Sequence, residues 1–408
     1  MKVLLLNQVF YPDVVAVAQQ LTDLGVDISA AGHEVTVLCS SRGYDNPGLH
    51  YPRREEQGGM RIVRVPVLGL GKKSIWRRVL GFASFFVTSF LWLMLMPRQD
   101  VVVVTPPPPL LSFMAAIFVK LRGGRLVYWN MDLNPDEAIA AGWMREDSFV
   151  ARFMAFALRF SLRASSSIIV LDRFMKERIL AKDIPEHKVH VVPIWSHDEA
   201  SQFDPEGRDA FRRQLGVEDK FVVMYSGNHT PLHPLDTVLE AALRLKDDER
   251  IAFAFVGGGS EQPRVKAFAE SHGLKNIFCA PYQPLAKLAG SLSAADMHVV
   301  VLGDPFVGIV HPCKIYNMMA VGAPFLYVGP TQSHIVDLRA EEDVARMGNF
   351  VRHGEVERVV EIISGMAVEW KAGCHSRPGR PRTLDRFTRQ ALMPEMIRLI
   401  EAASRTKP

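Results

Sequence analysis

The chain has 408 residues, of which 48% are hydrophobic and 23% are charged, and its formal net charge is +4. This length indicates two or three domains, and the composition excludes a disordered chain and a polytopic membrane protein. The four cysteines lie far apart without a Cys-x-x-Cys pair, which argues against a disulfide scaffold or a zinc site. A net charge this small does not by itself imply nucleic acid.

Short apolar strands alternate with helices along the chain, beginning with a strand at residues 2–6, a helix at 16–31 and a strand at 34–39. No basic segment precedes a long apolar stretch at the start, so we expect no signal peptide and a reducing compartment. The alternation predicts parallel sheets covered by helices. Residues 191–207 are expected to join two α/β domains. Further strands are predicted at 101–104, 125–129 and 167–171, and in the second domain at 221–226, 251–256, 276–280, 297–302 and 323–328.

Residues 57–98 contain seven basic residues and no acidic one. Within them, residues 79–96 form an uncharged run of 18 residues that follows Lys72, Lys73, Arg77 and Arg78. Three readings are open: a buried helix, a helix lying in a membrane interface, and a spanning helix at the lower limit of length. A span is disfavoured because the strand at residue 101 must rejoin the same sheet. An interfacial helix would bury the aromatic side chains of Phe82, Phe85, Phe86 and Trp92.

Glycines follow two strands of the second domain. The strand at 221–226 runs into Gly227, Asn228 and His229 before a helix at 235–245. A glycine between a parallel strand and a helix lets backbone N–H groups approach a phosphate. No Gly-x-Gly-x-x-Gly motif follows the first strand and the chain has no P-loop motif, which argues against a nicotinamide site and a P-loop nucleotidase. The next strand ends in Gly257, Gly258 and Gly259, which fit a tight turn or a close approach of ligand.

The most specific pattern lies between residues 281 and 324, at residues 281–283, 292–296, 312–317 and 320–324. Together with residues 225–228 and 256–259, it resembles glycosyltransferase family 4, the retaining enzymes of the GT-B fold. Within that family it is similar to the transferases of bacterial exopolysaccharide and O-antigen assembly. Residues 32–35, 105–110 and 132–136 resemble the same branch, so the resemblance spans nearly the whole chain.

The resemblance implies an α/β GT-B fold with two Rossmann-like domains that face each other across a cleft. We expect an N-terminal acceptor-binding domain at residues 1–195 that carries a membrane-facing apolar helix. A C-terminal domain at 196–383 would bind the nucleotide-sugar. The last segment, 384–408, would form a helix that returns to the first domain.

The resemblance also implies the site. Lys314 would neutralise the diphosphate at the start of a helix, and Asp132 would act near the anomeric carbon. The alternatives are a solvated lysine and, for Asp132, a helix cap formed with Asn134 and Asp136. The implied donor-binding residues are Gly227, Asn228, His229, Gly257, Gly258, Gly259, Pro281, Tyr282, Gln283, Pro312, Cys313 and Asn317. The implied acceptor-binding residues are Tyr11, Asp13, Val14 and Val15.

Three departures from the family pattern leave an inactive or unusually specific member open. The two glutamates that most relatives carry around this helix start correspond to Ile309 and Asn317. The basic pair that follows the Gly-Asn motif is absent, and His229 or His233 is the candidate to replace it. The glycine pair of the first loop is Val14 and Val15 here.

The function implied by the resemblance is a retaining transfer of a sugar from a nucleotide-sugar to a lipid-linked glycan in cell-surface polysaccharide assembly. The enzyme would be cytoplasmic and peripheral at the inner face of the cytoplasmic membrane, on an anionic surface and without nucleic acid. No metal constellation is visible, and we expect neither a metal nor a cofactor. The alternatives are a non-catalytic GT-B partner subunit and a nucleotide-sugar epimerase.

Overall fold

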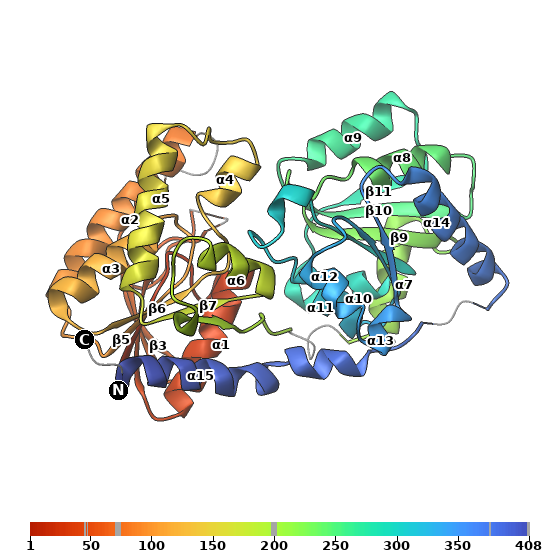
Figure 1. The fold of residues 1–408 in the computed structure, drawn as a ribbon. Helices are drawn as coiled ribbons and strands as arrows, with labels where there is room; N and C mark the ends of the chain where they lie inside the picture. The colour runs from red at the N-terminus through yellow and green to blue at the C-terminus, as the bar shows by residue number, and fades with distance from the viewer. Residues whose placement is uncertain (45, 47, 70–74, 197–201, 375–376, 406–408) are drawn as a thin grey trace. The chain divides into compact units, whose positions relative to one another are not determined.

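The chain folds as two compact units in a computed structural model that describes residues 1–408 except 45, 47, 70–74, 197–201, 375–376 and 406–408 (Figure 1). Unit 1 comprises Met1–Ile194, Gly308–Val310 and Leu392–Pro408, and unit 2 comprises Trp195–Val307 and His311–Ala391. The end of the chain therefore belongs to the N-terminal unit, where Glu401 Oε1 lies 2.9 Å from His33 Nε2. The expected join at 191–207 lies partly outside the described residues.

The sheet of unit 1 has, within the described part of the chain, eight strands in the order β3-β4-β2-β1-β5-β6-β7-β8. All neighbours pair in parallel except β3 and β4, which are antiparallel. The inner strands are apolar and buried because helices cover both faces of a parallel sheet. The strands are β1 (Lys2–Leu6), β2 (Glu34–Ser40), β3 (Arg54–Gln57), β4 (Met60–Val65), β5 (Val101–Val104), β6 (Arg125–Trp129), β7 (Ser167–Val170) and β8 (Val189–Val191).

Three helices of unit 1 lie side by side. They follow β4, β5 and β6, and right-handed crossovers in the same direction place them on one face of the sheet. The middle helix, α3, packs against both α2 and α5. The helices of unit 1 are α1 (Ala16–Ala30), α2 (Ile75–Leu95), α3 (Leu111–Arg122), α4 (Asp136–Ala140), α5 (Phe149–Ala164), α6 (Arg173–Leu180) and, after unit 2, most of α15 (Arg389–Arg405).

Unit 2 has a sheet of six described strands, all parallel, in the order β11-β10-β9-β12-β13-β14. Its strands are β9 (Phe221–Asn228), β10 (Ile251–Gly258), β11 (Ile277–Ala280), β12 (Met297–Val301), β13 (Phe325–Val328) and β14 (Gly348–Val351). Its helices are α7 (Pro205–Leu215), α8 (Asp236–Arg244), α9 (Gln262–Ser271), α10 (Leu288–Ser293), α11 (Lys314–Ala320), α12 (His334–Leu338), α13 (Glu342–Ala345) and α14 (Val356–Lys371). The expected α/β class with two parallel sheets is confirmed.

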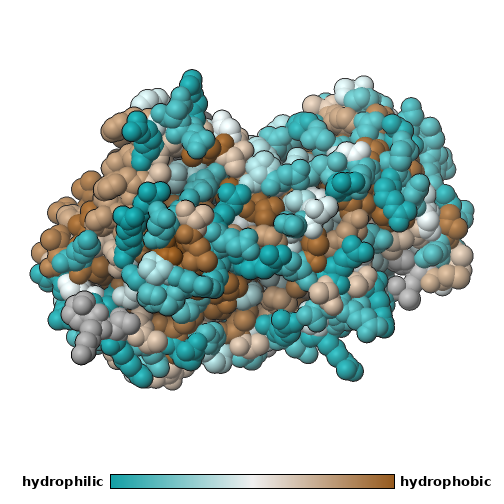
Figure 2. Space-filling view, in the orientation of Figure 1, coloured by the Kyte–Doolittle hydropathy of each residue, from teal (hydrophilic) through white to brown (hydrophobic). Residues whose placement is uncertain are grey.

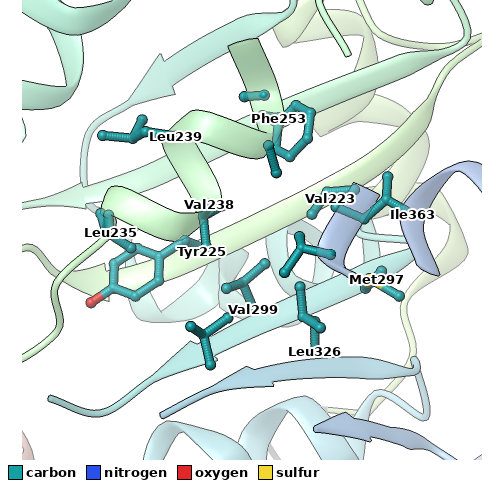
Figure 3. Close-up of a cluster of buried hydrophobic side chains, with 14 of the residues drawn as sticks. Val223, Tyr225, Leu235, Val238, Leu239, Phe253, Met297, Val299, Leu326 and Ile363 are labelled. Carbon is teal, nitrogen blue, oxygen red and sulfur yellow. The ribbon is translucent and has the colours of Figure 1, made fainter. Parts of the chain in front are cut away.

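The core of unit 2 forms where α8 and α14 cover the sheet. Figure 3 shows Val238 and Leu239 from α8 and Ile363 from α14 beside strand residues such as Phe253 and Val299. Tyr225 belongs to this cluster through its ring, while its hydroxyl points away from it. The core thereby fixes the end of β9, where the glycines are.

Helix α2 buries one face and exposes another. Phe85 and Leu93 are fully buried, whereas Leu95 is 82% and Trp76 is 77% exposed. The expectation that Phe85 faces a membrane is wrong, because it points into the domain, while Phe82, Phe86 and Trp92 are half-buried. Of the expected basic cluster, Lys72 and Lys73 lie outside the described residues. Among the described helices, none combines the length and the apolar character that a membrane span needs.

Candidate functional site

In unit 2 the neighbouring strands β9 and β10 end side by side in glycine-rich segments, Gly227-Asn228 and Gly257-Gly258, which we call the glycine turn. The two strands are in register, with Gly227 opposite Gly257 and Asn228 opposite Gly258. Gly257 has a φ of 131°, and a Cβ there would lie 2.1 Å from the carbonyl oxygen of Gly227. Only glycine fits that position. At Gly227, whose φ is 139°, a Cβ would instead lie 3.1 Å from Lys314 Nζ. Of these two glycines, Gly227 is therefore the one that borders the Lys314 ammonium.

Lys314 lies against this turn. It is the first residue of α11, and its Nζ donates a 2.8 Å hydrogen bond to Tyr225 Oη and lies 4.0 Å from the centroid of the Tyr225 ring. Tyr225 Oη in turn donates to the carbonyl oxygen of Asn228 at 2.7 Å. Burial lowers the pKa of Lys314 to about 7. The side chain is half-buried and held by Tyr225, which argues against the solvated first-turn residue of the alternative reading. Within the described part of the chain the ammonium forms no ion pair.

Two histidines stand beside this lysine as neutral groups. The ring of His229 is fully buried, with Nδ1 3.3 Å from Gly258 O and Nε2 without a hydrogen-bond partner. His233 Nδ1 lies 2.7 Å from Val301 O. Burial, and then the charge of Lys314, lowers the pKa of His233 to about 3, and burial also lowers the pKa of His229. The lowered pKa of both rings argues against the expectation that a histidine replaces the missing cations.

The segment after β11 places an exposed aromatic ring against the glycine turn. Tyr282 contacts Gly258, and its Oη lies 3.4 Å from Gly258 O. Gln283 Nε2 donates to Pro281 O at 2.9 Å, which closes this segment on itself. An exposed aromatic ring can stack on another aromatic ring. Tyr282, one of the predicted donor-binding residues, thus lies beside the glycines of β10.

The remaining expected donor residues lie at the start of α11 with Lys314. Pro312 is buried, and Cys313 occupies the N-cap position without a side-chain hydrogen bond to the helix. Asn317 is half-buried. Ile309, which the family resemblance places at a glutamate position, is buried in unit 1, and its carbonyl oxygen accepts a 3.0 Å hydrogen bond from Leu133 N. That position is an apolar packing position in this chain.

In unit 1, the carboxyl group of Asp132 lies near that of Glu137. Burial, and then the charge of Glu137, raises the pKa of Asp132 to about 7. The pKa of Glu137 is also raised by burial, although Asn134 Nδ2 donates to its Oε2 at 3.0 Å. Asp132 is not a helix cap, because α4 has Pro135 at its N-cap and no side-chain cap.

A small cavity of about 20 Å³ lies beside Asp132. It is lined by the proline-rich segment after β5, by Tyr128 from β6, and by Met154 and Leu158 from α5. A carboxyl group beside a cavity, with a pKa near neutrality, can accept a hydrogen bond from a hydroxyl group when it is ionised and donate one when it is protonated. Glu137 was missed by sequence reasoning, since no motif identified it.

The first loop, expected to bind the acceptor, is mostly held by internal bonds. Asp13 accepts hydrogen bonds from Tyr51 Oη at 3.0 Å and Tyr44 N at 3.2 Å. The carbonyl oxygen of Tyr11 accepts from the buried Arg64 at 2.8 Å. Val15 is the N-cap of α1. Val14 alone of the four expected residues is strongly exposed, at 66%, so Tyr11 and Asp13 shape the loop rather than offer free groups.

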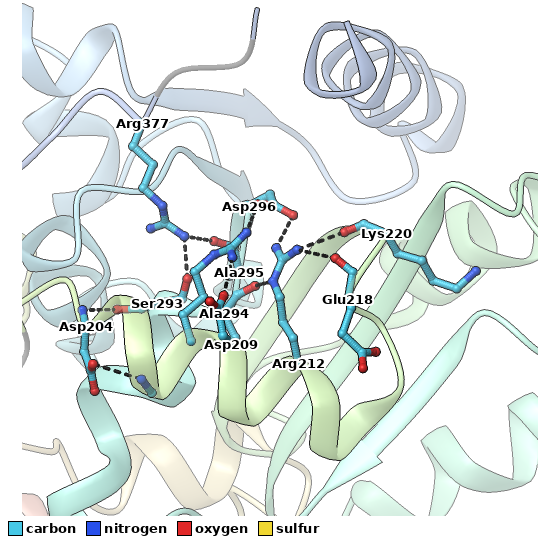
Figure 4. Close-up of polar contacts among 12 residues, drawn as sticks. Asp204, Asp209, Arg212, Glu218, Lys220, Ser293, Ala294, Ala295, Asp296 and Arg377 are labelled. Atoms are coloured by element: carbon cyan, nitrogen blue, oxygen red, sulfur yellow. Dashed lines mark hydrogen bonds and ion pairs between the residues drawn. The ribbon is translucent and has the colours of Figure 1, made fainter. Parts of the chain in front are cut away.

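Asp296, in the family-like segment 292–296, is part of the framework of unit 2. It pairs with the buried Arg212 (Figure 4) and also accepts a 2.8 Å hydrogen bond from Val222 N. Arg212 also donates to Ala294 O at 2.9 Å, and Arg377 donates to Ser293 O and Ala295 O at 2.5 Å each. These bonds join α7, α10 and the start of β9. The motif is therefore structural, and its arginine partners carried no sequence signal.

Two family descriptions match most of the chain. "Glycosyl transferase 4-like domain" matches residues 16–195, and "Glycosyl transferases group 1" matches residues 207–326. The Escherichia coli K12 protein WcaI, named as a glycosyl transferase of colanic acid biosynthesis, is 28% identical over 333 residues, or 79% of this chain and 82% of WcaI. The Pseudomonas aeruginosa protein WbjE, named as a glycosyltransferase, is 26% identical over 243 residues, 59% of this chain and 60% of WbjE.

Solved structures with the same fold cover nearly the whole chain. HepE from Anabaena, in complex with UDP, has a TM-score of 0.70 at 15% identity and covers 98% of this chain and 100% of its own. WaaG, a glycosyltransferase involved in lipopolysaccharide biosynthesis, has a TM-score of 0.66 at 15% identity over 98% and 99% of the two chains. Sucrose-phosphate synthase from Thermosynechococcus elongatus reaches 0.75 at 15% identity over 98% of each chain. At such identities the likeness concerns the fold.

Proposed function

Because the chain belongs to the glycosyltransferases of family 4 type with the GT-B fold, we propose that it transfers a sugar from a nucleotide-sugar to a lipid-linked saccharide in cell-surface polysaccharide assembly. The transfer retains the anomeric configuration of the donor. WcaI, a relative over four fifths of its length, is named for colanic acid biosynthesis. The HepE complex with UDP supports a nucleoside diphosphate as the leaving group.

The unpaired ammonium of Lys314 beside Gly227 is the observation that carries this proposal. A diphosphate brought against the glycine turn would supply the negative charge that Lys314 lacks within the described part of the chain. A charge-assisted bond of this kind is about twice as strong as a neutral one. Tyr282, whose side chain is 58% exposed beside Gly258, is the group that would stack on the base.

The proposed transfer is a front-face displacement. The acceptor oxygen forms a bond to the anomeric carbon as the bond from that carbon to the diphosphate breaks, and the acceptor proton passes to an oxygen of the leaving diphosphate. Negative charge grows on the diphosphate during this step, and Lys314 stabilises it. Asp132 accepts a hydrogen bond from an acceptor hydroxyl and orients it. Because Lys314 supplies the positive charge, the proposed transfer needs no metal ion and should persist in EDTA.

The proposed acceptor is lipid-linked, and the protein would work as a peripheral enzyme on the inner face of the cytoplasmic membrane. The exposed apolar face of α2 supports this proposal, since Trp76, Leu91 and Leu95 extend from it in the described part of unit 1. Large exposed apolar side chains on one helix face are typical of interaction surfaces. A lipid-linked acceptor at the membrane surface would then lie close to the N-terminal domain.

The first test is a thermal-shift screen with UDP-, GDP- and dTDP-sugars. A donor at 100 times its dissociation constant stabilises the native protein by about 2.7 kcal/mol, so the correct base should stand out. Turnover is then measured with that donor and a membrane lipid extract as acceptor, with EDTA in a parallel sample. The anomeric configuration of the product is read by NMR. An inverted product would contradict the retaining mechanism, and no stabilisation by any nucleotide-sugar would contradict the donor class.

A non-catalytic partner subunit is the second candidate. The buried Ile309 and the half-buried Asn317 stand where the family pattern has glutamates, which favours a protein that binds a donor without using it. Such a protein would bind the nucleotide-sugar, form a stable complex with another transferase, and transfer nothing alone. An epimerase would instead convert the free nucleotide-sugar with no acceptor present. Turnover without an acceptor therefore identifies an epimerase, and turnover with an acceptor separates a transferase from a partner subunit.

A further inference from the structure

Unit 2 contains a large pocket whose described lining includes none of the predicted donor-binding residues. Its volume is about 690 Å³, within the range of about 300–1,000 Å³ that is typical of small-molecule sites. The segments that follow β9, β12 and β14 form its walls together with α8, α9 and the start of α14. The pocket therefore lies at the edge of the sheet where the parallel strands end. We call it the α8 pocket.

Hydrogen bonds hold the strand-end segments of the α8 pocket together. Gly303 N donates to Leu232 O at 2.9 Å, which joins the segment after β12 to the segment after β9. Gly354 N donates to Thr237 Oγ1 at 3.0 Å, which joins the segment after β14 to α8. The pocket is therefore formed before a ligand binds, which lowers the entropy that binding costs.

Cyclic apolar side chains line the α8 pocket. Pro231, Pro234 and Pro305 contribute to its lining together with Phe268 of α9, and each of them retains exposed surface. Proline loses no side-chain entropy when a ligand covers it. The faces of a pyranose ring carry C–H groups, which can pack against such side chains through dispersion contacts.

The apolar lining is local. Figure 2 shows a mostly hydrophilic surface over the part of unit 2 where Figure 1 draws α8 and α9. A docking surface for another protein commonly exposes a wide apolar patch, and this face of the unit has none. The pocket therefore favours a small ligand over a protein surface.

Hydrogen-bond acceptors accompany the apolar side chains. Asp304, the first residue of η4 (Asp304–Phe306), is exposed, and Glu240 of α8 is half-buried. His353 Nε2 donates to Leu302 O at 2.8 Å, so Nδ1 of the neutral ring is an acceptor. Two carboxylates and an imidazole nitrogen can thus accept hydrogen bonds from hydroxyl groups.

The charge of the α8 pocket is negative. Among the lining residues that the structure describes, Asp236, Glu240 and Asp304 are acidic and Arg264 is the cation. Arg264 pairs with Asp236, so the other two carboxylates set the sign. Like charges repel, which argues against a diphosphate and hence against a second nucleotide-sugar site. A neutral polyol meets no such repulsion and offers hydroxyl donors to the carboxylates.

We propose that the α8 pocket binds a neutral saccharide, a stretch of the glycan on which the enzyme acts. Ring faces would pack on the prolines and Phe268, and hydroxyl groups would donate to Asp304 and Glu240. The segment after β9 connects the pocket to the glycine turn, so the glycan would be held at the same edge of the sheet as the donor. The identity of the glycan rests on the proposed function, whereas its binding in the pocket is tested without a donor.

Binding of the full-length protein to an array of neutral, anionic and amino-sugar oligosaccharides tests the inference, with no nucleotide-sugar present. We expect binding to neutral oligosaccharides, and the strongest of them is then titrated by calorimetry. Its dissociation constant should not depend on salt, because screening acts only between charges. An octalysine peptide is the competitor that represents a cationic ligand.

The variant Asp304→Asn with Glu240→Gln keeps the shape of the pocket and removes two charged acceptors. The dissociation constant of the oligosaccharide should rise about tenfold for each carboxylate removed. The matched control, Asp219→Asn with Glu249→Gln, makes the same change of charge at exposed positions that precede β9 and β10, at the opposite edge of the sheet. It should bind the oligosaccharide as the wild type does.

Four outcomes overturn the proposal: a wild type that binds no neutral glycan, unchanged affinity in the pocket variant, equal weakening in the control, and displacement of the glycan by octalysine. Thermal shifts with the nucleotide-sugar should be the same in the pocket variant and the wild type. A smaller shift in the pocket variant would assign the pocket to the donor sugar and also overturn the proposal. Glycan binding that the pocket variant loses, in a protein that no nucleotide-sugar stabilises, would support the pocket and contradict the proposed function.

Discussion

Lys314 Nζ donates to Tyr225 Oη at 2.8 Å and lies 4.0 Å from the centroid of the same ring. This relationship ties the first residue of α11 to the end of β9, residues that are 89 positions apart in the chain. The tyrosine ring is held by the core of unit 2, and its hydroxyl also bonds the backbone at Asn228. The ammonium is therefore positioned before any donor arrives. Preorganised charge of this kind stabilises a transition state without further reorganisation.

Removal of the ammonium should therefore reduce turnover. Lys314→Met keeps the apolar stem and deletes the charge, and we expect kcat to fall about 10²–10³-fold, the effect of losing one preorganised contact. The free energy of unfolding should change by no more than about 1 kcal/mol, because the lost hydrogen bond is offset by relief of the desolvated ammonium. Steady-state kinetics and thermal melts measure the two quantities. Lys287→Met, an exposed lysine of the same unit, is the control, and equal kcat values for the two variants would remove Lys314 from the mechanism.

Donor binding should depend on pH through the same group. The pKa of Lys314 is about 7 in the free protein, and a bound diphosphate raises it, so binding takes up a proton above that pH. Affinity for a nucleotide-sugar should be constant below about pH 7 and fall by up to tenfold per pH unit above it, until the pKa of the complex is reached. Calorimetry in two buffers of different ionisation enthalpy measures the proton uptake.

Tyr225→Phe is the informative variant for this titration. It removes the hydroxyl that accepts the hydrogen bond of the ammonium, so the pKa of Lys314 should fall further. The pH at which affinity begins to drop should then move downward. In Lys314→Met the dependence should vanish. A slope that persists in Lys314→Met would assign the titration to another group.

The glycine turn should tolerate no side chain at Gly257. Gly257→Ala places a Cβ against the carbonyl oxygen of Gly227 at a φ of 131°, so the two strands must separate. We expect a loss of at least about 2 kcal/mol in the free energy of unfolding, and loss of donor binding. Gly273→Ala is the control, since its φ is also positive, at 60°, and no atom lies within 4 Å of the added carbon. It should cost about 1 kcal/mol, and an equal cost at Gly257 would show that the turn is loosely packed.

Much of the fold could be predicted because buried parallel strands are continuous apolar runs. β5, with the sequence of four valines, and β10 are of this kind. Of the strands that were missed, β3 is charged, and β14 is half-exposed at the edge of its sheet. β4 includes a buried arginine, Arg64, which pairs with Glu55 at 2.6 Å. An ion pair between a buried arginine and a glutamate nine residues earlier has no recognisable pattern in the sequence.

The site could be predicted only as far as its motifs. The motif residues Gly227, Gly257 and Lys314 do come together in unit 2. The sequence contained no sign of Tyr225 as the group that holds Lys314, because that contact depends on how α11 lies against β9. The protonation state of His233 could not be predicted from the sequence either, since its low pKa comes from burial and from the charge of Lys314. Residue types and spacing predict the members of a site, whereas their pKa values depend on packing.

The carboxyl pair of unit 1 should make stability fall as the pH rises. The pKa of Asp132 is about 7 in the folded protein and lower in the unfolded chain, whose ordinary value is 3.8. The folded state therefore holds a proton that the unfolded state releases between about pH 4 and pH 7, and the free energy of unfolding decreases through that window. Asp132→Asn cannot ionise, so it should match the wild type near pH 4 and exceed it by at least about 1 kcal/mol near pH 8. Urea denaturation at several pH values measures this difference. Asp136→Asn, which breaks a 2.8 Å ion pair with Lys182, is the control and should lower the free energy of unfolding at neutral pH.

If Asp132 also orients the acceptor, Asp132→Asn should lower kcat while donor affinity is unchanged. A purely structural aspartate would not produce this combination of higher stability and lower turnover.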